Sequence, residues 1–306
     1  MLDFTLPSRE ELEGEDRLEV IRNVGPKAAV TDYAILLGCL VNDEHLNNEP
    51  KTLENRTATY WTRTGFSFSL GTGAYFMYDG GWTNQLEPEI RFYGGRPMID
   101  YSEIEDYVTK QKINKYGVLE VEYGEYPGML ADSTVSKQLE KLYEDKILTR
   151  TKKKYTCDRT KWQNKDKGFS EKKIIEYEYN REKYIRFVAT SNSNGLILSN
   201  GEEAKEGKAY WIKVEPIVWY VDEETDMAFS KKVLFSGIQY DEYKKYSGSF
   251  FNTNMKRFLD KCFSKEIIPS KVYKKAGDGI DSIFEEAIEQ VDKINNKVKI
   301  KNKSLF

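Results

Sequence analysis

The strongest strand signal in the chain is the run at 210–221, Tyr-Trp-Ile-Lys-Val-Glu-Pro-Ile-Val-Trp-Tyr-Val. Most of its positions hold aromatic or β-branched residues, which are enriched in strands because they pack well on a pleated surface. Pro216 lies in the middle of the run and has no backbone N–H to donate to a neighbouring strand. We therefore expect Pro216 at a bulge or a sheet edge, with the run divided there into two strands.

Several other segments have strand patterns. They are 118–127, a hairpin formed by 174–179 and 184–188, and 227–235, which returns after a turn at 222–226. In the first of these, apolar and polar side chains alternate, which predicts a strand with one solvent-facing side. Glu122 and Glu125 suit a solvated strand edge, although such a pair of carboxylates could also perform acid–base chemistry.

Helix signals lie between the strands. Ser8 and Glu11 have the spacing of a capping box, and the sparse apolar residues after them predict a surface helix that ends at Gly25 and Pro26. The clearest amphipathic pattern is 130–146, whose apolar stripe should pack on a sheet. Further helices are expected at 31–40, 253–263 and 281–295.

These elements predict an α+β fold in which short antiparallel sheets are flanked by helices. A chain of 306 residues can bury one large core or two moderate ones. We expect a composite domain over 1–269, because neither its N-terminal part (1–105) nor its C-terminal part (118–269) has a full set of strands. A charged connector at 106–117 should join the parts, and 270–306 should form a helix and a basic tail.

Composition narrows the classes of function. The chain is 39% hydrophobic and 32% charged, which indicates a folded and soluble protein. It has no signal-type apolar segment and no apolar run of membrane length, so we expect cytoplasmic synthesis without a signal peptide and no contact with a membrane.

Nucleic acid is not an expected partner. A net charge of -3 gives no general attraction to it. The basic segment 150–173 does interleave lysines with Tyr155 and Trp162, a pattern that can bind nucleic acid by phosphate contact and stacking. Acidic residues dilute this segment, and the favoured interpretation is a solvated loop.

Residues for catalysis and metal binding are scarce. The only histidine, His45, lies in a polar segment, so a hydrolytic triad is not expected. Cys39, Cys157 and Cys262 are far apart and lack the paired spacing of a zinc site or a disulfide framework. We predict no catalytic residue, no cofactor and no metal.

The stretch at 60–101 has the chemistry of a binding surface. Between Tyr-Trp-Thr-Arg-Thr at 60–64 and Gly-Gly-Arg-Pro at 94–97, it is rich in aromatic, Ser, Thr, Gly and Asn residues. Rigid aromatic contact area combined with adaptable hydrogen bonding is typical of binding loops. Core packing is the alternative for each ring. The candidate ligand-binding residues are Phe66, Phe68, Tyr75, Tyr78, Asp79, Trp82, Asn84 and Tyr93.

Several motifs in combination carry a resemblance to a known group of proteins. They are the two anchors above, Tyr-Gly-Glu-Tyr-Pro at 123–127, and the segments 214–219, 228–235 and 252–259. With them, the chain resembles uncharacterised proteins of gut Firmicutes and their prophages that have a C-type-lectin-like domain of the formylglycine-generating-enzyme type. In such domains the aromatic-Arg and Gly-Arg-Pro elements come last. Here they come first, so the resemblance implies a circularly permuted fold.

The resemblance also implies roles for individual residues. Trp61, Arg63, Arg96 and Trp219 would be framework residues, and each arginine could either brace a loop or hold an anionic ligand. Domains of this fold also serve as variable proteins of diversity-generating retroelements, and 65–93 looks like such a variable segment. The calcium motifs of lectins have only faint counterparts at 82–84 and 87–89, and the cysteine chemistry of the formylglycine-generating enzymes has no counterpart in the matched segment.

We therefore expect a non-enzymatic recognition protein of phage or prophage type, associated in some cases with the virion, that binds a protein or a glycan through 65–93. One alternative is an enzyme related to the formylglycine-generating enzymes. Another is a structural or assembly protein whose C-terminal helix joins it to a second copy or to a partner.

Overall fold

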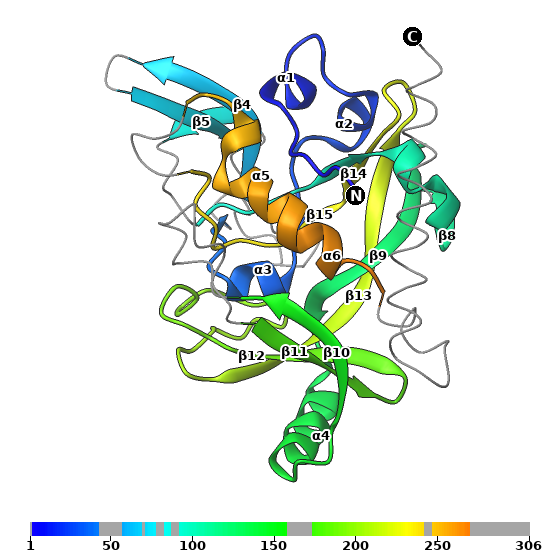
Figure 1. Cartoon of the computed structure of the whole chain (residues 1–306), viewed down its shortest axis with the longest axis vertical. Helices are drawn as coiled ribbons and strands as arrows, with labels where there is room; N and C mark the ends of the chain where they lie inside the picture. The colour runs from blue at the N-terminus through cyan, green and yellow to red at the C-terminus, as the bar shows by residue number, and fades with distance from the viewer. Residues whose placement is uncertain are drawn as a thin grey trace. The chain divides into compact units, whose positions relative to one another are not determined.

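Strand β13 (Ala209–Asp222) is the central strand of the molecule (Figure 1). The computed structural model describes residues 2–42, 57–68, 71–77, 83–86, 92–157, 173–241 and 247–269, with the backbone alone for 42, 66–68, 71–73 and 83–86. Residues 2–267 form one compact unit, and Ile268 and Pro269 belong to a second. Of this second unit the structure describes only Ile268 and Pro269, so the helix and tail expected at 270–306 lie outside the described residues.

The large sheet has eight strands. In order they are β10 (Thr149–Thr156), β11 (Lys173–Tyr179), β12 (Glu182–Val188), β13, β14 (Met227–Ser230) and β7 (Met98–Asp100), with β9 (Leu119–Leu130) on β13 and β8 (Lys110–Ile113) on β9. All these pairs are antiparallel. The long strands β9 and β13 connect the lower part of the sheet, with β10–β12, to the upper part, with β14 (Figure 1).

Pro216 does not divide β13 into two strands, so that part of the prediction was wrong. The strand stays continuous because β9 pairs with it from Ile212 to Val221, with a register shift between Pro216 and Val218. On the other side of β13, β12 pairs as far as Val214 and β14 begins at Trp219. Pro216 thus lies at an irregularity between two partner strands, where a missing N–H is tolerated.

Two smaller sheets complete the β structure of the described residues. One has the order β15 (Lys232–Val233), β1 (Ala29–Val30), β3 (Thr57–Ala58) and β2 (Val41–Asn42). The other has the order β4 (Tyr60–Phe68), β5 (Gly71–Met77) and β6 (Thr83–Leu86). The parallel pair β1–β15 joins residues about 200 positions apart, so the ends of the unit are folded onto each other.

Four of the six helices of the described residues begin at a capping side chain. The helices are α1 (Arg9–Leu12), α2 (Glu19–Val24), α3 (Asp32–Leu36), α4 (Ser133–Glu144), α5 (Asn254–Phe258) and α6 (Ser264–Glu266), with a π-helical turn, η5 (Leu259–Phe263), between the last two. The side chains of Ser8, Thr31, Asp132 and Thr253 accept hydrogen bonds from the first turns of α1, α3, α4 and α5. Below, α5, η5 and α6 together are called the α5–α6 segment.

Residues from both halves of the sequence share one hydrophobic core, which extends from Phe4 to Ile267. The ring of Phe4 packs against Trp219 at 6.0 Å and Phe263 at 5.0 Å, and so connects the N-terminal segment to β13 and η5. A second, smaller cluster holds α4 on the sheet, where Leu139 packs with Tyr177, Tyr184 and Trp211.

Three local predictions were wrong. The segment after Ser8 forms two helices rather than one surface helix, and its apolar residues, Leu12, Leu18, Val20 and Ile21, are buried in the core. Residues 149–156 form a strand rather than a solvated loop, and Tyr155 is fully buried. The expected connector includes β8, which pairs with β9 and so belongs to the large sheet. Trp162 lies outside the described residues.

Candidate functional site

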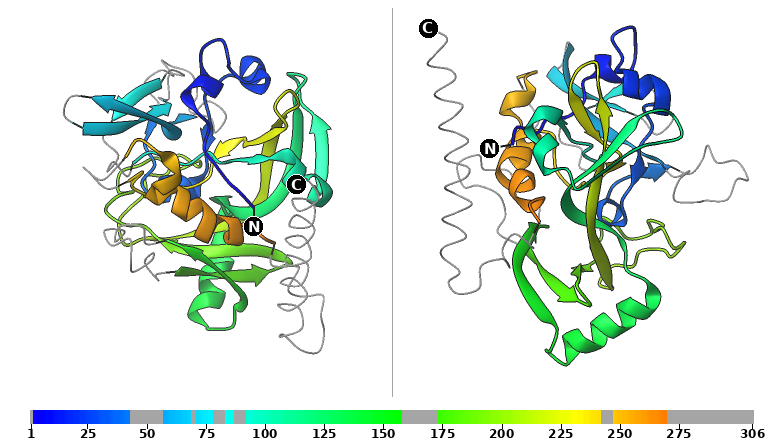
Figure 2. Two further views of the ribbon diagram at one scale, coloured as in Figure 1. Left: turned by 45° about the horizontal axis from the view of Figure 1, so that its top comes forward. Right: turned by 90° about the vertical axis from the view of Figure 1, so that its right-hand side faces the viewer.

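The stretch predicted to bind a ligand forms the sheet β4–β5–β6. Strand β4 pairs with β5 from Tyr60–Met77 at one end to Phe68–Gly71 at the other, and β6 pairs with the second half of β5. The β4–β5 hairpin projects from the rest of the unit in Figure 1 and in the left view of Figure 2. One end of this sheet is therefore attached to the body and the other extends away from it.

The attached end is buried. Tyr60, Trp61, Phe76 and Met77 are all part of the core. The indole of Trp61 lies 6.1 Å from the ring of Phe76 and 5.2 Å from that of Tyr240, measured between ring centroids. The sheet is thus fixed at its base by close aromatic packing.

Tyr93, a predicted ligand-binding residue, contributes to this base. Its ring lies 4.4 Å from that of Phe76 and 5.0 Å from that of Trp61. The side chain is partly buried and packs against the core. The face of Tyr93 that meets Phe76 is therefore occupied by the protein itself.

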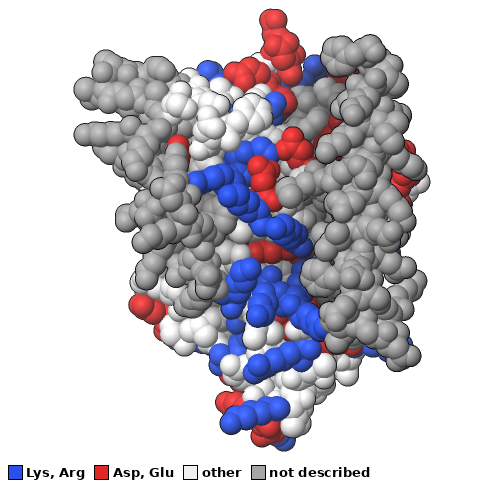
Figure 3. All heavy atoms as spheres, viewed as in Figure 1, with Lys and Arg blue, Asp and Glu red and all other residues white. Residues whose placement is uncertain are grey.

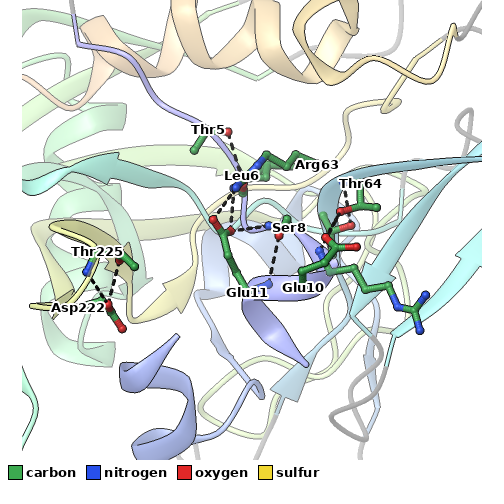
Figure 4. A network of polar contacts seen from close by, with 11 residues as sticks. Thr5, Leu6, Ser8, Glu10, Glu11, Arg63, Thr64, Asp222 and Thr225 are labelled. Carbon is green, nitrogen blue, oxygen red and sulfur yellow. Dashed lines mark hydrogen bonds and ion pairs between the residues drawn. The ribbon is translucent and has the colours of Figure 1, made fainter. Parts of the chain in front are cut away.

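A network of polar contacts joins β4 to α1 (Figure 4). The carboxylate of Glu11 accepts hydrogen bonds from the Ser8 N–H at 2.6 Å, as the capping box predicts, and from Nη1 of Arg63 at 2.7 Å. Nη2 of Arg63 completes a bidentate ion pair with Glu11, and Nη1 also donates to the Leu6 carbonyl at 2.6 Å. Arg63 thus makes a planar, two-point contact with a residue 52 positions away.

A polar and aromatic ridge, formed by Arg9, Glu10, Thr64 and Tyr75, lies beside this network. Thr64 Oγ1 accepts a hydrogen bond from the Arg9 N–H at 2.9 Å and donates one to Glu10 at 3.1 Å. The guanidinium of Arg9 lies 4.8 Å from the ring centroid of Tyr75. Burial acts to raise the pKa of Glu10, but hydrogen bonds from its own backbone and from Thr64 lower it overall. Of the four ridge residues, only Tyr75 was predicted from the sequence as a ligand-binding residue. The capping box predicts where the helix of Arg9 and Glu10 begins, but it does not show which strand this helix contacts.

Arg96 lies at the junction of the sheets and is fully buried. Its Nε donates to the Ser230 carbonyl at 2.8 Å, and its Nη1 donates to the Pro26 carbonyl at 3.0 Å and to the Tyr60 hydroxyl at 3.2 Å. The guanidinium carbon lies 3.7 Å from the ring centroid of Phe229. Burial lowers the pKa of Arg96, and Tyr60 acts in the opposite direction. These contacts use the arginine to join distant segments.

The remaining predicted residues are placed as follows. Trp219 is buried, and its Nε1 donates to the Tyr123 carbonyl at 2.9 Å. Tyr78, Asp79 and Trp82 lie outside the described residues, as do His45, the motif at 87–89 and the side chains of Phe66, Phe68 and Asn84.

A second polar cluster lies inside the large sheet. Glu125 on β9 forms an ion pair with Lys183 on β12, although the sequence predicts Glu125 at a solvated edge. Nζ of Lys153 on β10 lies 3.4 Å from the Glu125 carbonyl oxygen. Burial lowers the pKa of Lys153 to about 8, although the nearby carboxylates of Glu176 and Glu125 act to raise it.

This cluster continues toward α6. The hydroxyl of Tyr155 donates to Glu176 at 2.7 Å, and the Thr156 N–H donates to Glu266 at 2.7 Å. Lys153, Tyr155, Glu176, Lys183 and Glu266 are all buried. The contacts of this cluster join β9 to β12, β10 to β11 and β10 to α6, so the geometry favours a structural role for it.

The three cysteines differ in burial, and Cys157 and Cys262 are partly exposed. Cys39 is fully buried, and burial raises the pKa of its thiol to about 12, which disfavours the nucleophilic thiolate. In the described part of the chain, no three His, Cys, Asp or Glu residues lie close enough together to hold a metal ion. No helix among the described residues has the length and apolar character needed to cross a membrane.

Comparisons with protein-family models, with curated proteins and with solved structures each found no match.

Proposed function

We propose that this chain is a non-enzymatic recognition protein that presents the sheet β4–β5–β6 and its connecting segments to a protein or a glycan. The observation that carries the proposal is that this sheet is held firmly on the body of the protein. Its base is packed into the core through Trp61 and Phe76, and its side is braced on α1 through Arg63 and Glu11. A rigid support reduces the entropy that a binding surface loses when a ligand orders it.

The contacts between motifs support a permuted lectin-like fold as part of this proposal. Arg96 of the Gly-Arg-Pro element donates to Ser230, and Gly95 forms a β-bridge with Phe235. Both partners belong to the segment at 228–235, which follows in the sequence but would precede that element in the usual order. In a permuted fold, the N-terminal third must pack against strands that come later in the sequence, and these contacts do so.

The composition of 65–93 further suggests a segment that varies between relatives, as in proteins of phage and prophage diversity systems. Gly, Ser, Thr and Tyr tolerate many neighbours and supply adaptable contacts. Sequencing of close relatives tests this part: substitutions concentrated at 65–93 support it, and an invariant polar set in the same segment supports catalysis instead.

A binding experiment tests the proposed surface. The probes are an array of bacterial glycans and a set of purified bacterial surface proteins, applied to the wild-type chain and to the Tyr75→Ala variant. Tyr107→Ala is the matched control, because Tyr107 is an exposed tyrosine on η3 (Glu105–Tyr107), outside the ridge. We expect binding to at least one probe that falls about tenfold in Tyr75→Ala and is retained in Tyr107→Ala. Equal binding by all three proteins, or binding by none, would contradict the proposal.

A further inference from the structure

A band of basic side chains runs along one face of the molecule, between residues that are not described (Figure 3). Figure 3 shows Lys and Arg side chains gathered in a band along the middle of this face, where α5, α6 and β10 lie in Figure 1. The exposed members are Arg150, Lys152 and Lys154 on β10 and Lys261 and Lys265 on the α5–α6 segment. Below, these five residues are called the basic strip.

The two elements that carry the strip are joined. The backbone N–H of Thr156, at the end of β10, donates to the side chain of Glu266 on α6 at 2.7 Å. Lys154 lies two residues before this contact on one element, and Lys265 lies one residue before it on the other. The exposed lysines of β10 and of the α5–α6 segment therefore lie on two elements that are in direct contact.

The charged residues follow closely along each element. Lys152 and Lys154 are exposed on either side of the buried Lys153, in the part of β10 where the register with β11 shifts. Lys261 in η5 and Lys265 in α6 are exposed as well. A linear polymer with closely spaced anionic groups could contact several of these side chains at once.

The charge of the strip is not neutralised within the described part of the protein. No carboxylate among the described residues forms an ion pair with Lys152, Lys154, Lys261 or Lys265. The two acidic residues of the α5–α6 segment are occupied elsewhere. Asp260 pairs with Lys256 at 2.5 Å, and Glu266 accepts the Thr156 N–H.

We propose that the basic strip binds a linear anionic polysaccharide. This surface is separate from the sheet β4–β5–β6 and would give the protein a second, charge-based contact with a cell surface. A polysaccharide is favoured over nucleic acid because the aromatic rings of these elements, Tyr155, Phe258 and Phe263, are buried and cannot stack on bases.

The test uses heparin as the polysaccharide probe and single-stranded oligothymidylate of equal charge as the nucleic-acid probe. Binding of the full chain is measured by titration at low and at high salt. The strip variant carries Lys152→Gln, Lys154→Gln, Lys261→Gln and Lys265→Gln. A matched pair compares Lys152→Gln/Lys154→Gln with Lys110→Gln/Lys112→Gln on β8, because both pairs are exposed lysines two residues apart on a strand.

We expect heparin to bind the wild type, to weaken as salt increases, and to bind the strip variant at least about tenfold more weakly. The β8 pair should change heparin binding less than the β10 pair does, and circular dichroism should show that each variant is folded. Three results would overturn the proposal: no heparin binding by the wild type, an equal loss in the two pairs, or tighter binding of oligothymidylate than of heparin. The last result would assign the strip to nucleic acid.

Discussion

Charge is buried in two regions of this molecule, by two different means. At the junction of the sheets, Arg96 is surrounded by neutral groups: two carbonyls, a hydroxyl and the ring of Phe229. Within the described residues it forms no ion pair with a carboxylate. Inside the large sheet, Lys183 is paired with Glu125, and Lys153 lies beside the same glutamate through its backbone carbonyl.

The difference shows what each region contributes. A guanidinium has five N–H donors in a fixed plane, so Arg96 can satisfy carbonyls from separate segments and hold them in one geometry. The Pro26, Tyr60 and Ser230 groups that it contacts come from three parts of the chain. Lys153 inside the sheet acts as a point charge whose pKa is lowered by burial, so its effect on stability depends on its protonation state. The first region therefore holds three segments in a fixed geometry, and the second makes stability depend on pH.

Removal of the Arg96 side chain should give the largest loss of stability. Arg96→Ala is expected to lower the free energy of unfolding by about 4 kcal/mol, because it leaves buried carbonyls without donors and a cavity beside Phe229. Urea denaturation measures this change. Arg22→Ala, at an exposed position on α2, is the control and should change stability by less than about 0.5 kcal/mol. An Arg96→Ala variant that is as stable as the wild type but fails to bind ligand would show that Arg96 is a binding residue.

The pH dependence of the second region should give the next largest effect. The pKa of Lys153 is lowered from its ordinary 10.5 to about 8, chiefly by burial. Between these two values the unfolded chain keeps a proton that the folded chain has lost, so stability from this group rises as pH increases. The rise amounts to about 3 kcal/mol from pH 8 to 10.5.

Lys153→Met removes this titrating group at similar volume. The unfolding free energies of wild type and variant are measured from pH 7 to 10.5. At pH 7 the variant should be the more stable protein, and the difference between the two free energies should shrink as pH rises. Parallel curves across this range would show that Lys153 titrates normally in the folded protein.

Removal of one partner from an ion pair compares a buried pair of the large sheet with an exposed one. Glu125→Gln leaves the charge of Lys183 buried without its partner and should cost about 2 kcal/mol. The matched control is Glu182→Gln, which breaks the exposed pair with Lys213 on the same sheet and should cost less than about 1 kcal/mol. Equal costs for the two variants, measured by chemical denaturation, would mean that burial does not decide the strength of these pairs.

The brace beneath the candidate site should give the smallest effect. Arg63 and Glu11 are partly exposed, so a double-mutant cycle with Arg63→Ala and Glu11→Ala should give a coupling energy of about 1 kcal/mol. Hydrogen exchange in α1 and β4 should increase together in both single variants. Exchange that increases in α1 alone would show that the helix does not support the sheet.

Sequence analysis predicted those parts of the fold that are set by neighbouring residues. The hairpin of β11 and β12 was confirmed, and its turn residues Asn180 and Arg181 both have positive φ, as a two-residue turn of this kind requires. The capping box of Ser8 and Glu11 was also confirmed, and so was a helix within 31–40, which Thr31 caps. Each of these signals is contained in a few consecutive residues.

The candidate site was predictable in its location but not in its supports. The aromatic stretch indicated where a binding sheet could form, and Trp61, Arg63 and Arg96 were recognised as framework candidates. Their partners Glu11 and Ser230 could not be identified, because they lie 52 and 134 positions away along the chain.

By itself, the sequence determined the strands β9 and β11–β14, the turn between β11 and β12, the capped start of α1 and the α+β class, since these follow from backbone preferences and short-range hydrogen bonds. Tertiary structure alone decided that the apolar residues of α2 enter the core, that β10 is a strand, and that Glu125 faces Lys183 rather than water. These outcomes depend on which distant surfaces meet. An apolar or charged side chain is the same in sequence whether it is covered or exposed, and only packing distinguishes the two.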